Sequence, residues 1–237
     1  MNAPLVFIPG WCLGRGPLQS TVDALEGQFF DLPGYAGTPL ITDFDAAADA
    51  VAATLAPGST LAGWSLGAQL ALAVAARHPD KVGKLVLVAG TASFVQRDGW
   101  PFAMPPAALA EFTTAIATDA EAMLPRFVGG FNRGDAQAKE VTRQLLELAD
   151  PRPSAEVLCA GLAWLAAVDL RPQLAGIQTP TLLVHGAADP LMPQGAAEAL
   201  AAALPNSQLA LIADCAHAPF VSRQADFLSA VRRFLHD

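Results

Sequence analysis

The chain has 237 residues, of which 53% are hydrophobic and 15% are charged. This composition is typical of a well-buried globular protein and excludes a largely disordered chain. The formal net charge of −8 disfavours nucleic acid as a general partner, because an acidic surface repels phosphates. No apolar run reaches the roughly 18 residues that a membrane helix needs, so no membrane association is expected.

The first ten residues and the cysteines bear on cellular location. Residues 1–10 carry no basic segment ahead of an apolar run, and they predict a strand rather than a secretory signal. The three cysteines, Cys12, Cys159 and Cys215, are odd in number and lack C-x-x-C spacing, which favours reduced thiols over disulfides or a zinc site. A cytoplasmic location is therefore expected.

Apolar and helical patterns alternate in the first ninety residues. The expected strands are 4–8, 29–32, 60–62 and 84–89, and the expected helices are 17–25, 43–55 and 66–77. Thr42 or Asp43 is expected to cap the helix at 43–55. Alternation of this kind is typical of an α/β protein whose mostly parallel sheet has helices on both faces.

The alternation stops between about 93 and 170, where helical patterns are separated by Pro and Gly. The helices expected there are 106–118, 120–127, 136–148 and 154–168. Strands are expected again at 181–184 and 208–212, with helices at 194–203 and 224–234. We therefore expect a core made of 1–92 and 171–237, interrupted by a helical cap at 93–170.

The pentapeptide Gly63-Trp64-Ser65-Leu66-Gly67 lies between an expected strand and an expected helix. It matches the G-x-S-x-G elbow, in which a strained strand-to-helix turn exposes the serine Oγ and requires small residues two before and two after it. An isolated match of this kind also fits an ordinary strand-helix connection. The partners that Ser65 would need decide between the two interpretations.

A serine hydroxyl is a weak nucleophile and needs a basic histidine, which in turn needs an acid to fix its tautomer. Of the four histidines, His78 follows a helix on the expected surface, and His236 is next to the end of the sequence. His185 ends a strand and is interpreted as structural, packing beneath the loop that follows it. His217 comes just after the last expected strand, and it is the predicted base.

Asp189 follows the preceding strand, so it and His217 are expected at the same edge of the sheet, where sites assemble. The order Ser65, Asp189, His217 is that of α/β-hydrolases. Two alternatives stand: Asp189 as a simple turn residue before Pro190, and Asp214 as a rival acid. Asp214 is too close in sequence to His217 to reach its Nδ1 easily, which favours Asp189.

Acyl transfer also needs donors for the developing oxyanion. In this fold they are the N–H of the residue after the nucleophile and an N–H from an early loop, which here are Leu66 and Trp11. Ordinary apolar packing is the alternative interpretation of the Trp11 and Trp64 side chains. This chemistry needs no metal and no cofactor.

Further motifs extend the pattern along most of the chain. They are Gly10-Trp11, Asp31-Leu32-Pro33-Gly34-Tyr35, Arg97-Asp98-x-Trp100-Pro101, Val168-Asp169-Leu170-Arg171 and Ala216-His217-Ala218-Pro219-Phe220. Together with the Trp-bearing elbow, they resemble the α/β-hydrolase fold esterases of biotin synthesis, the pimeloyl-[acyl-carrier protein] methyl ester esterases. The elbow is shared by the whole superfamily, whereas its combination with Arg-Asp-x-Trp-Pro is more specific.

The resemblance implies hydrolysis of a methyl ester on an acyl chain that is tethered to an acidic carrier protein. It assigns the triad to Ser65, Asp189 and His217, and the oxyanion donors to Trp11 and Leu66. Further substrate contacts are assigned to Trp64 and Phe127. Contacts with the carrier are assigned to Arg126, Lys139 and Arg143. From the residues themselves, four of the fourteen basic residues lie within the eighteen positions 126–143. A cap face for an anionic carrier and ordinary solvated helix charges near Asp135 and Glu140 are the two interpretations.

Two departures from the family are visible. Pro9 replaces the histidine that usually precedes Gly10-Trp11, which leaves the Trp11 N–H in place but changes how the loop is anchored. The segment before the first strand is short, so the opening antiparallel strands of the superfamily are expected to be absent.

The alternatives to this esterase are a broad-specificity short-chain carboxylesterase and a non-catalytic ligand receptor on the same fold. A monomer is expected.

Overall fold

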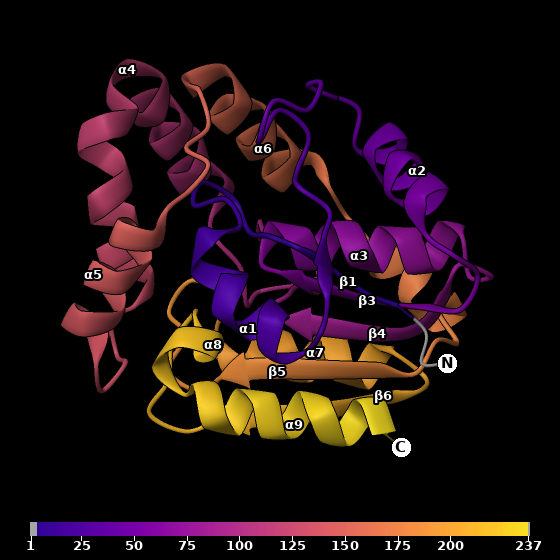
Figure 1. Ribbon diagram of the computed structural model, residues 1–237. Helices are drawn as coiled ribbons and strands as arrows, with labels where there is room; N and C mark the ends of the chain where they lie inside the picture. Colours follow the sequence, from indigo (N-terminus) through magenta and orange to yellow (C-terminus); the bar gives the residue numbers. More distant parts are fainter. Residues whose placement is uncertain (1–3, 237) are drawn as a thin grey trace.

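A six-stranded parallel sheet forms the centre of the computed structural model, which describes residues 4–236 (Figure 1). Its strands are β1 (Leu5–Ile8), β2 (Gln28–Phe29), β3 (Ser59–Trp64), β4 (Val82–Val88), β5 (Thr181–Gly186) and β6 (Ser207–Ile212). They lie in the order β2-β1-β3-β4-β5-β6, and each neighbouring pair is parallel. The predicted α/β class with a parallel sheet is confirmed.

Helices cover both faces of this sheet, as Figure 1 shows for α2 and α3 on one face and α9 on the other. Those of the sheet region are α1 (Gln19–Ala24), α2 (Phe44–Thr54), α3 (Leu66–Arg77), α7 (Gln194–Ala203), α8 (Pro219–Ser222) and α9 (Gln224–His236), with short 3-10 helices at Gly16–Leu18 and Arg171–Gly176. Asp43 caps α2, since its Oδ1 accepts the Ala46 N–H at 2.7 Å. The short helix α8 was not predicted.

The strand expected at 29–32 is shorter and begins one residue earlier. Only Gln28 and Phe29 pair with β1. The chain then leaves the sheet, because the Asp31 carboxylate pairs with Arg15 at 3.0 Å and Pro33 opens a turn. This edge of the sheet is therefore very short, which limits the number of backbone groups it presents to other chains.

Three further helices lie together beyond the carboxyl ends of the strands: α4 (Pro106–Phe131), α5 (Ala138–Leu148) and α6 (Ala155–Ala167) (Figure 1). We call them the cap helices. The backbone of α4 is non-helical at Asp119, whose Oδ1 caps the next segment by accepting the Ala122 N–H at 3.0 Å. The break falls where two separate helices were predicted. The division into a core and a 93–170 cap stays a prediction.

The two ends of this segment are tied together by an ionic cluster. Asp169 accepts a hydrogen bond from Arg171 at 2.8 Å and lies 3.7 Å from Arg97. Arg97 also donates to the Ala167 carbonyl at 2.9 Å, at the C-terminus of α6, where a positive charge is favourable. Arg171 donates to the backbone oxygen of Asp98. The chain therefore leaves and re-enters the sheet region at one fixed point.

We predict that Asp169→Asn destabilises the protein by about 1 kcal/mol at neutral pH, because both arginines lose their anionic partner. The hydrogen bond from Arg171 lowers the pKa of the Asp169 carboxyl. A lowered pKa contributes stability above the pKa of free aspartate, and this contribution is lost as the pH falls through the folded-state pKa. Urea unfolding at a series of pH values should therefore show the two proteins converging in acid. A constant difference between them would contradict the ionic explanation.

Candidate active site

The turn from β3 into α3 has the geometry of a nucleophile elbow. A Cβ on Gly63 would lie 2.2 Å from the Gly67 carbonyl oxygen, and a Cβ on Gly67 would lie 2.3 Å from the Ile8 carbonyl oxygen. Neither site can hold a side chain, so the predicted need for small residues on both sides of Ser65 is confirmed. The close approach also sets the start of α3 against the end of β1.

Ser65 itself has a φ of 56° and a ψ of −115°, a region that residues other than Gly rarely adopt. Such strain costs on the order of 1–3 kcal/mol and persists only where the surroundings fix the backbone. Here the Ser65 N–H donates to the Val88 carbonyl at 2.9 Å, and the Ser65 carbonyl accepts the Ala68 N–H at 3.0 Å. The serine is only 8% exposed.

The predicted base and acid are hydrogen-bonded to each other. His217 Nδ1 donates to Asp189 Oδ2 at 2.7 Å, and both side chains are buried. The other oxygen of Asp189 accepts the N–H groups of Leu191 at 2.9 Å and Met192 at 3.0 Å. Asp189 is thus both a turn residue and the partner of His217, and its two oxygens together accept three hydrogen bonds.

Asp214, the rival acid, has an exposed side chain, and its backbone oxygen accepts from Ala136 at 3.1 Å. His185 packs beneath the acid loop, as predicted. Its Nε2 donates to the Met192 carbonyl at 2.7 Å and lies 3.8 Å from Asp189 Oδ2. Burial lowers the pKa of His185, so this imidazole is neutral at neutral pH.

Ser65 and His217 line a common cavity of about 10 Å³. The other lining residues are Trp11, Trp64, Phe94, Phe127, Phe131, Leu165 and Leu191. The hydrogen bonds found within residues 4–236 do not include one between Ser65 Oγ and the His217 ring. In substrate-free enzymes this contact is often long and tightens only when substrate binds. A cavity of this size holds about one water molecule, so the space beside Ser65 is narrow in this structure.

The two predicted oxyanion donors lie beside the elbow. Leu66 is the first residue of α3, where a helix leaves its N–H without an internal partner, and Trp11 follows Gly10 at the end of β1. Within residues 4–236, no hydrogen bond from either amide to a protein acceptor is found. The next residue, Cys12, has a φ of 73°, and its N–H donates to the Tyr35 hydroxyl at 3.0 Å. Tyr35 thus fixes the loop that carries Trp11.

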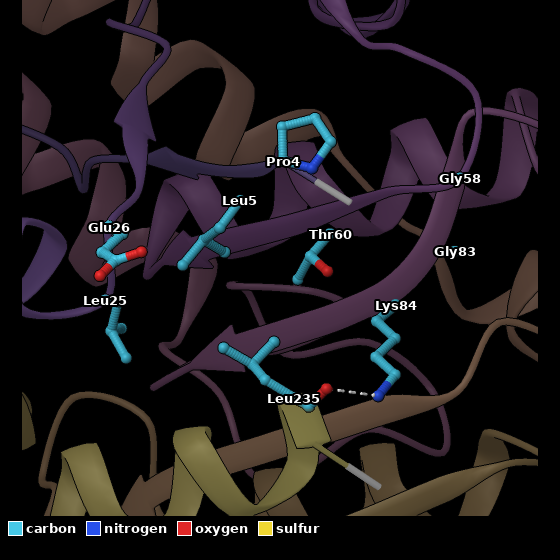
Figure 2. Close-up of a pocket in the computed structure, with 9 residues that line it drawn as sticks. All are labelled: Pro4, Leu5, Leu25, Glu26, Gly58, Thr60, Gly83, Lys84 and Leu235. Carbon is cyan, nitrogen blue, oxygen red and sulfur yellow. Dashed lines mark hydrogen bonds between the residues drawn. The ribbon is translucent and has the colours of Figure 1, made fainter. Parts of the chain in front are cut away.

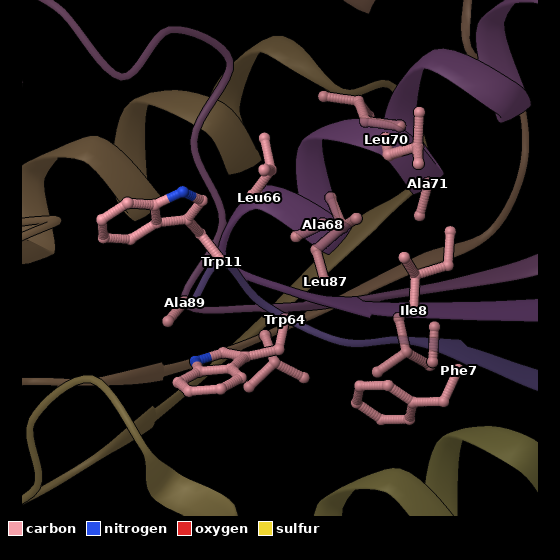
Figure 3. Packing of buried hydrophobic residues seen from close by; sticks show 14 of the residues in the cluster. Phe7, Ile8, Trp11, Trp64, Leu66, Ala68, Leu70, Ala71, Leu87 and Ala89 are labelled. Atoms are coloured by element: carbon pink, nitrogen blue, oxygen red, sulfur yellow. The ribbon is translucent and has the colours of Figure 1, made fainter. Parts of the chain in front are cut away.

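The Trp11 side chain joins this loop to the cap helices. Its Nε1 donates to the Leu158 carbonyl of α6 at 3.0 Å, and its ring meets Phe127 edge-on at 5.3 Å between centroids. A Cβ on Gly161 would lie 2.5 Å from the indole, so α6 also packs directly against it. Figure 3 shows Trp11 beside Leu66 at the start of α3. The indole is therefore part of the wall between the elbow and the cap helices.

Trp64 is hydrogen-bonded to the backbone of the predicted base. Its side chain is 1% exposed, and its Nε1 donates to the backbone oxygen of His217 at 2.9 Å. A Cβ on Gly10 would lie 2.8 Å from the same ring, so β1 also fits closely against it. Trp64 therefore connects the end of β1 to the backbone of His217. A contact between Trp64 and substrate stays a prediction.

The predicted carrier-binding residues are on α4 and α5. Arg126, Lys139 and Arg143 are exposed, whereas Phe127 points its ring into the cluster around Trp11. Arg143 forms ion pairs with two glutamates of its own helix, Glu140 and Glu147. Its charge is therefore partly neutralised. Asp135, near which solvated helix charges were the alternative interpretation, is buried.

Two larger cavities lie away from Ser65. One of about 430 Å³ is at the amino ends of β1, β3 and β4, where Lys84 Nζ donates to the backbone oxygen of Leu235 (Figure 2). The other, of about 570 Å³, lies among the cap helices and is lined in part by Cys12 and Leu158.

The three cysteines are free, as predicted. Burial raises the pKa of the Cys215 thiol to about 12, which keeps this thiol unreactive.

Comparison with known proteins places this geometry in a family. Residues 5–230 match the model described as the alpha/beta hydrolase family. The protein belongs to the α/β-hydrolase family. Among solved α/β-hydrolase structures, an esterase from Exiguobacterium antarcticum superposes with a TM-score of 0.89 at 23% identity, over 100% of this chain and 94% of its own. This likeness is one of fold alone.

Two similar relatives of this α/β-hydrolase carry the name pimeloyl-[acyl-carrier protein] methyl ester esterase. The one from Aromatoleum aromaticum is 39% identical over 241 residues, covering 95% of this chain and 96% of the relative. The one from Nitrosomonas europaea is 35% identical over 237 residues, covering 96% and 94%. The resemblance seen in the sequence motifs is therefore confirmed over nearly the full length of the chain.

We predict that Tyr35→Phe lowers kcat for a p-nitrophenyl ester about tenfold with KM within about twofold. The substitution leaves the buried Cys12 N–H without its acceptor, which should also cost about 1–3 kcal/mol in urea unfolding. Thr38→Val is the matched control, because it removes a hydroxyl that bonds within the same turn but not to Cys12. Equal kcat values for Tyr35→Phe and the wild type would contradict a role for Tyr35 in placing the oxyanion loop.

Proposed function

We propose that this protein is a serine carboxylesterase that hydrolyses the methyl ester of a pimeloyl-acyl-carrier-protein intermediate in biotin synthesis. The observation that carries the proposal is the 33–39% identity, over more than nine-tenths of the chain, to curated relatives that bear this name. The hydrogen-bonded pair of His217 and Asp189 beside Ser65 supports the chemistry.

Acylation begins at Ser65. As Ser65 Oγ attacks the ester carbonyl, His217 Nε2 accepts its proton, and Asp189 stabilises the resulting imidazolium through Nδ1–H. The N–H groups of Trp11 and Leu66 stabilise the oxyanion of the tetrahedral intermediate. When this intermediate collapses, the C–O bond to the methoxy group breaks, and His217 donates its proton to the leaving methanol. The acyl chain is then an ester of Ser65.

Deacylation repeats these steps with water. His217 accepts a proton from the water as its oxygen attacks the acyl-enzyme, and the same two amides hold the second oxyanion. The bond to Ser65 Oγ breaks, and Oγ regains its proton from His217. Ester and water thus give a free carboxylic acid and methanol, with no change of oxidation state and no need for a cofactor.

The acyl-carrier protein is the proposed partner, and small esters are the proposed minor substrates. Arg126 and Lys139 are exposed on neighbouring cap helices of a chain whose net charge is −8, which supports an anionic partner at this face. A cytoplasmic monomer is part of the same proposal. Within residues 4–236, no helix is both long and apolar enough to cross a bilayer.

We predict that Ser65→Ala lowers turnover of a p-nitrophenyl ester by about 10⁴-fold or more, because the nucleophile is lost while binding remains. Intact mass after treatment with a fluorophosphonate should show one adduct on the wild type and none on the variant. The wild-type gene should restore growth of a biotin auxotroph that lacks its own esterase, and the Ser65→Ala gene should not. Turnover without restored growth would point instead to a broad-specificity esterase, and no turnover at all to a ligand receptor.

We predict that Arg126→Glu and Lys139→Glu each lower kcat/KM for the carrier-linked methyl ester about tenfold, with turnover of a p-nitrophenyl ester unchanged. Arg143→Glu should have a smaller effect, because Glu140 and Glu147 already offset its charge. The matched control is Arg233→Glu, the same charge reversal near the end of α9. Equal losses for the control and the cap variants would exclude a specific carrier surface.

A further inference from the structure

The segment between α4 and α5 carries a buried carboxylate whose bonds reach the loop of the base. Asp135 is 7% exposed, and the ion pairs found within residues 4–236 do not include it. Its Oδ1 accepts the Gln137 N–H at 2.7 Å, next to the start of α5. Its Oδ2 accepts the Ala216 N–H at 3.0 Å, 81 positions away in sequence and directly before His217.

A carboxylate is costly to bury, and it is retained in such a place only when donors satisfy its oxygens. Both donors here are backbone amides, which give short and directional charge-assisted hydrogen bonds. The Gln137 bond is local to the start of α5. The hydrogen bond from the Ala216 N–H to Asp135 is not part of a helix or a strand. Its effect is to fix the backbone beside His217.

We propose that Asp135 is a positioning residue of the active site, because its carboxylate holds the Ala216 amide and thereby sets the backbone from which His217 faces Ser65 and Asp189. This rests on the proposed function only in requiring that the triad hydrolyses esters. It does not depend on the identity of the acyl group or of the carrier.

The other bonds of the loop explain why this one matters. On the core side, Trp64 Nε1 donates to the His217 carbonyl at 2.9 Å, and the Ala188 N–H donates to the Cys215 carbonyl at 2.9 Å. On the side of the cap helices, Asp135 supplies the acceptor for Ala216. Without that acceptor, the peptide between Cys215 and Ala216 keeps its hydrogen bond from Ala188. It loses the hydrogen bond that its N–H donates to Asp135.

Two neighbouring bonds join the same two segments. The Ala136 N–H donates to the Asp214 carbonyl at 3.1 Å, and Gln137 Nε2 donates to the Ser222 carbonyl at 3.3 Å. Residues 135–137 are therefore connected to both sides of His217. They lead directly into α5, so this cap helix is hydrogen-bonded to the loop that carries His217.

The test compares Asp135→Ala, Asp135→Asn and Asp214→Asn with the wild type. Asp214→Asn is the matched control, because it also removes one carboxylate charge close to His217. The Asp214 side chain is exposed, and the hydrogen bonds found within residues 4–236 do not include it. Each protein is assayed with a p-nitrophenyl ester, and kcat is normalised to the fraction of chains that a fluorophosphonate labels by intact mass. Thermal unfolding is recorded in parallel.

We expect Asp135→Ala to lower the normalised kcat by about 10- to 100-fold with KM within about twofold, since small misplacements of a catalytic group have effects of this order. Asp135→Asn keeps one acceptor oxygen, so it should recover part of the loss. Asp214→Asn should match the wild type. If Asp135→Ala does not fold, the drop in kcat of Asp135→Asn relative to Asp214→Asn decides the question.

The assignment is overturned if the Asp135 variants unfold at lower temperature but keep the wild-type kcat for each labelled site, because Asp135 would then only cap α5. It is equally overturned if Asp214→Asn loses as much activity, since a general charge effect would explain both. Absence of turnover in the wild type would instead refute the proposed function. The two failures are therefore distinguishable.

Discussion

The approach of Gly67 to the end of β1 is the constraint on which the site depends. With hydrogen in place of a side chain, α3 begins within contact of the Ile8 and Pro9 carbonyls. Trp11 follows the Pro9-Gly10 turn and Leu66 opens α3, so the two predicted oxyanion donors flank this contact in sequence. The contact also forces the serine into a left-handed conformation, which its two backbone hydrogen bonds maintain. Any larger residue at this position would move the start of α3 away from β1, together with Ser65 and Leu66.

The proposed base, His217, is held by three side chains that come from distant parts of the chain. Trp64 at the end of β3 fixes its carbonyl, Asp189 after β5 fixes its ring, and Asp135 between two cap helices fixes the preceding amide. The cap helices are also bonded to the oxyanion loop, through Trp11 and the Leu158 carbonyl. They are therefore hydrogen-bonded to the loop of Trp11 and to the loop of His217.

The sequence was sufficient for the features that local patterns encode. Buried parallel strands are continuous apolar runs, and strand ends place Asp189 and His217 at one edge of the sheet, so the order of motifs predicted their pairing. Asp135 and Tyr35 were missed because their roles depend on partners 81 and 23 positions away. Asp135 follows Gly134, a sequence that is typical of an exposed turn. Its burial results from the packing of this turn against the segment that carries Ala216.

The aromatic rings around Ser65 close the site to a volume of about 10 Å³. An acyl group larger than this space must displace some of these rings, and Phe127 and Phe131 belong to the part of α4 that follows the break at Asp119. Separating packed rings costs free energy, which the contacts of the entering molecule must offset. A long acyl chain brings more such contacts than a short one. The free energy of moving these rings therefore enters the binding of an ester before any bond to Ser65 forms.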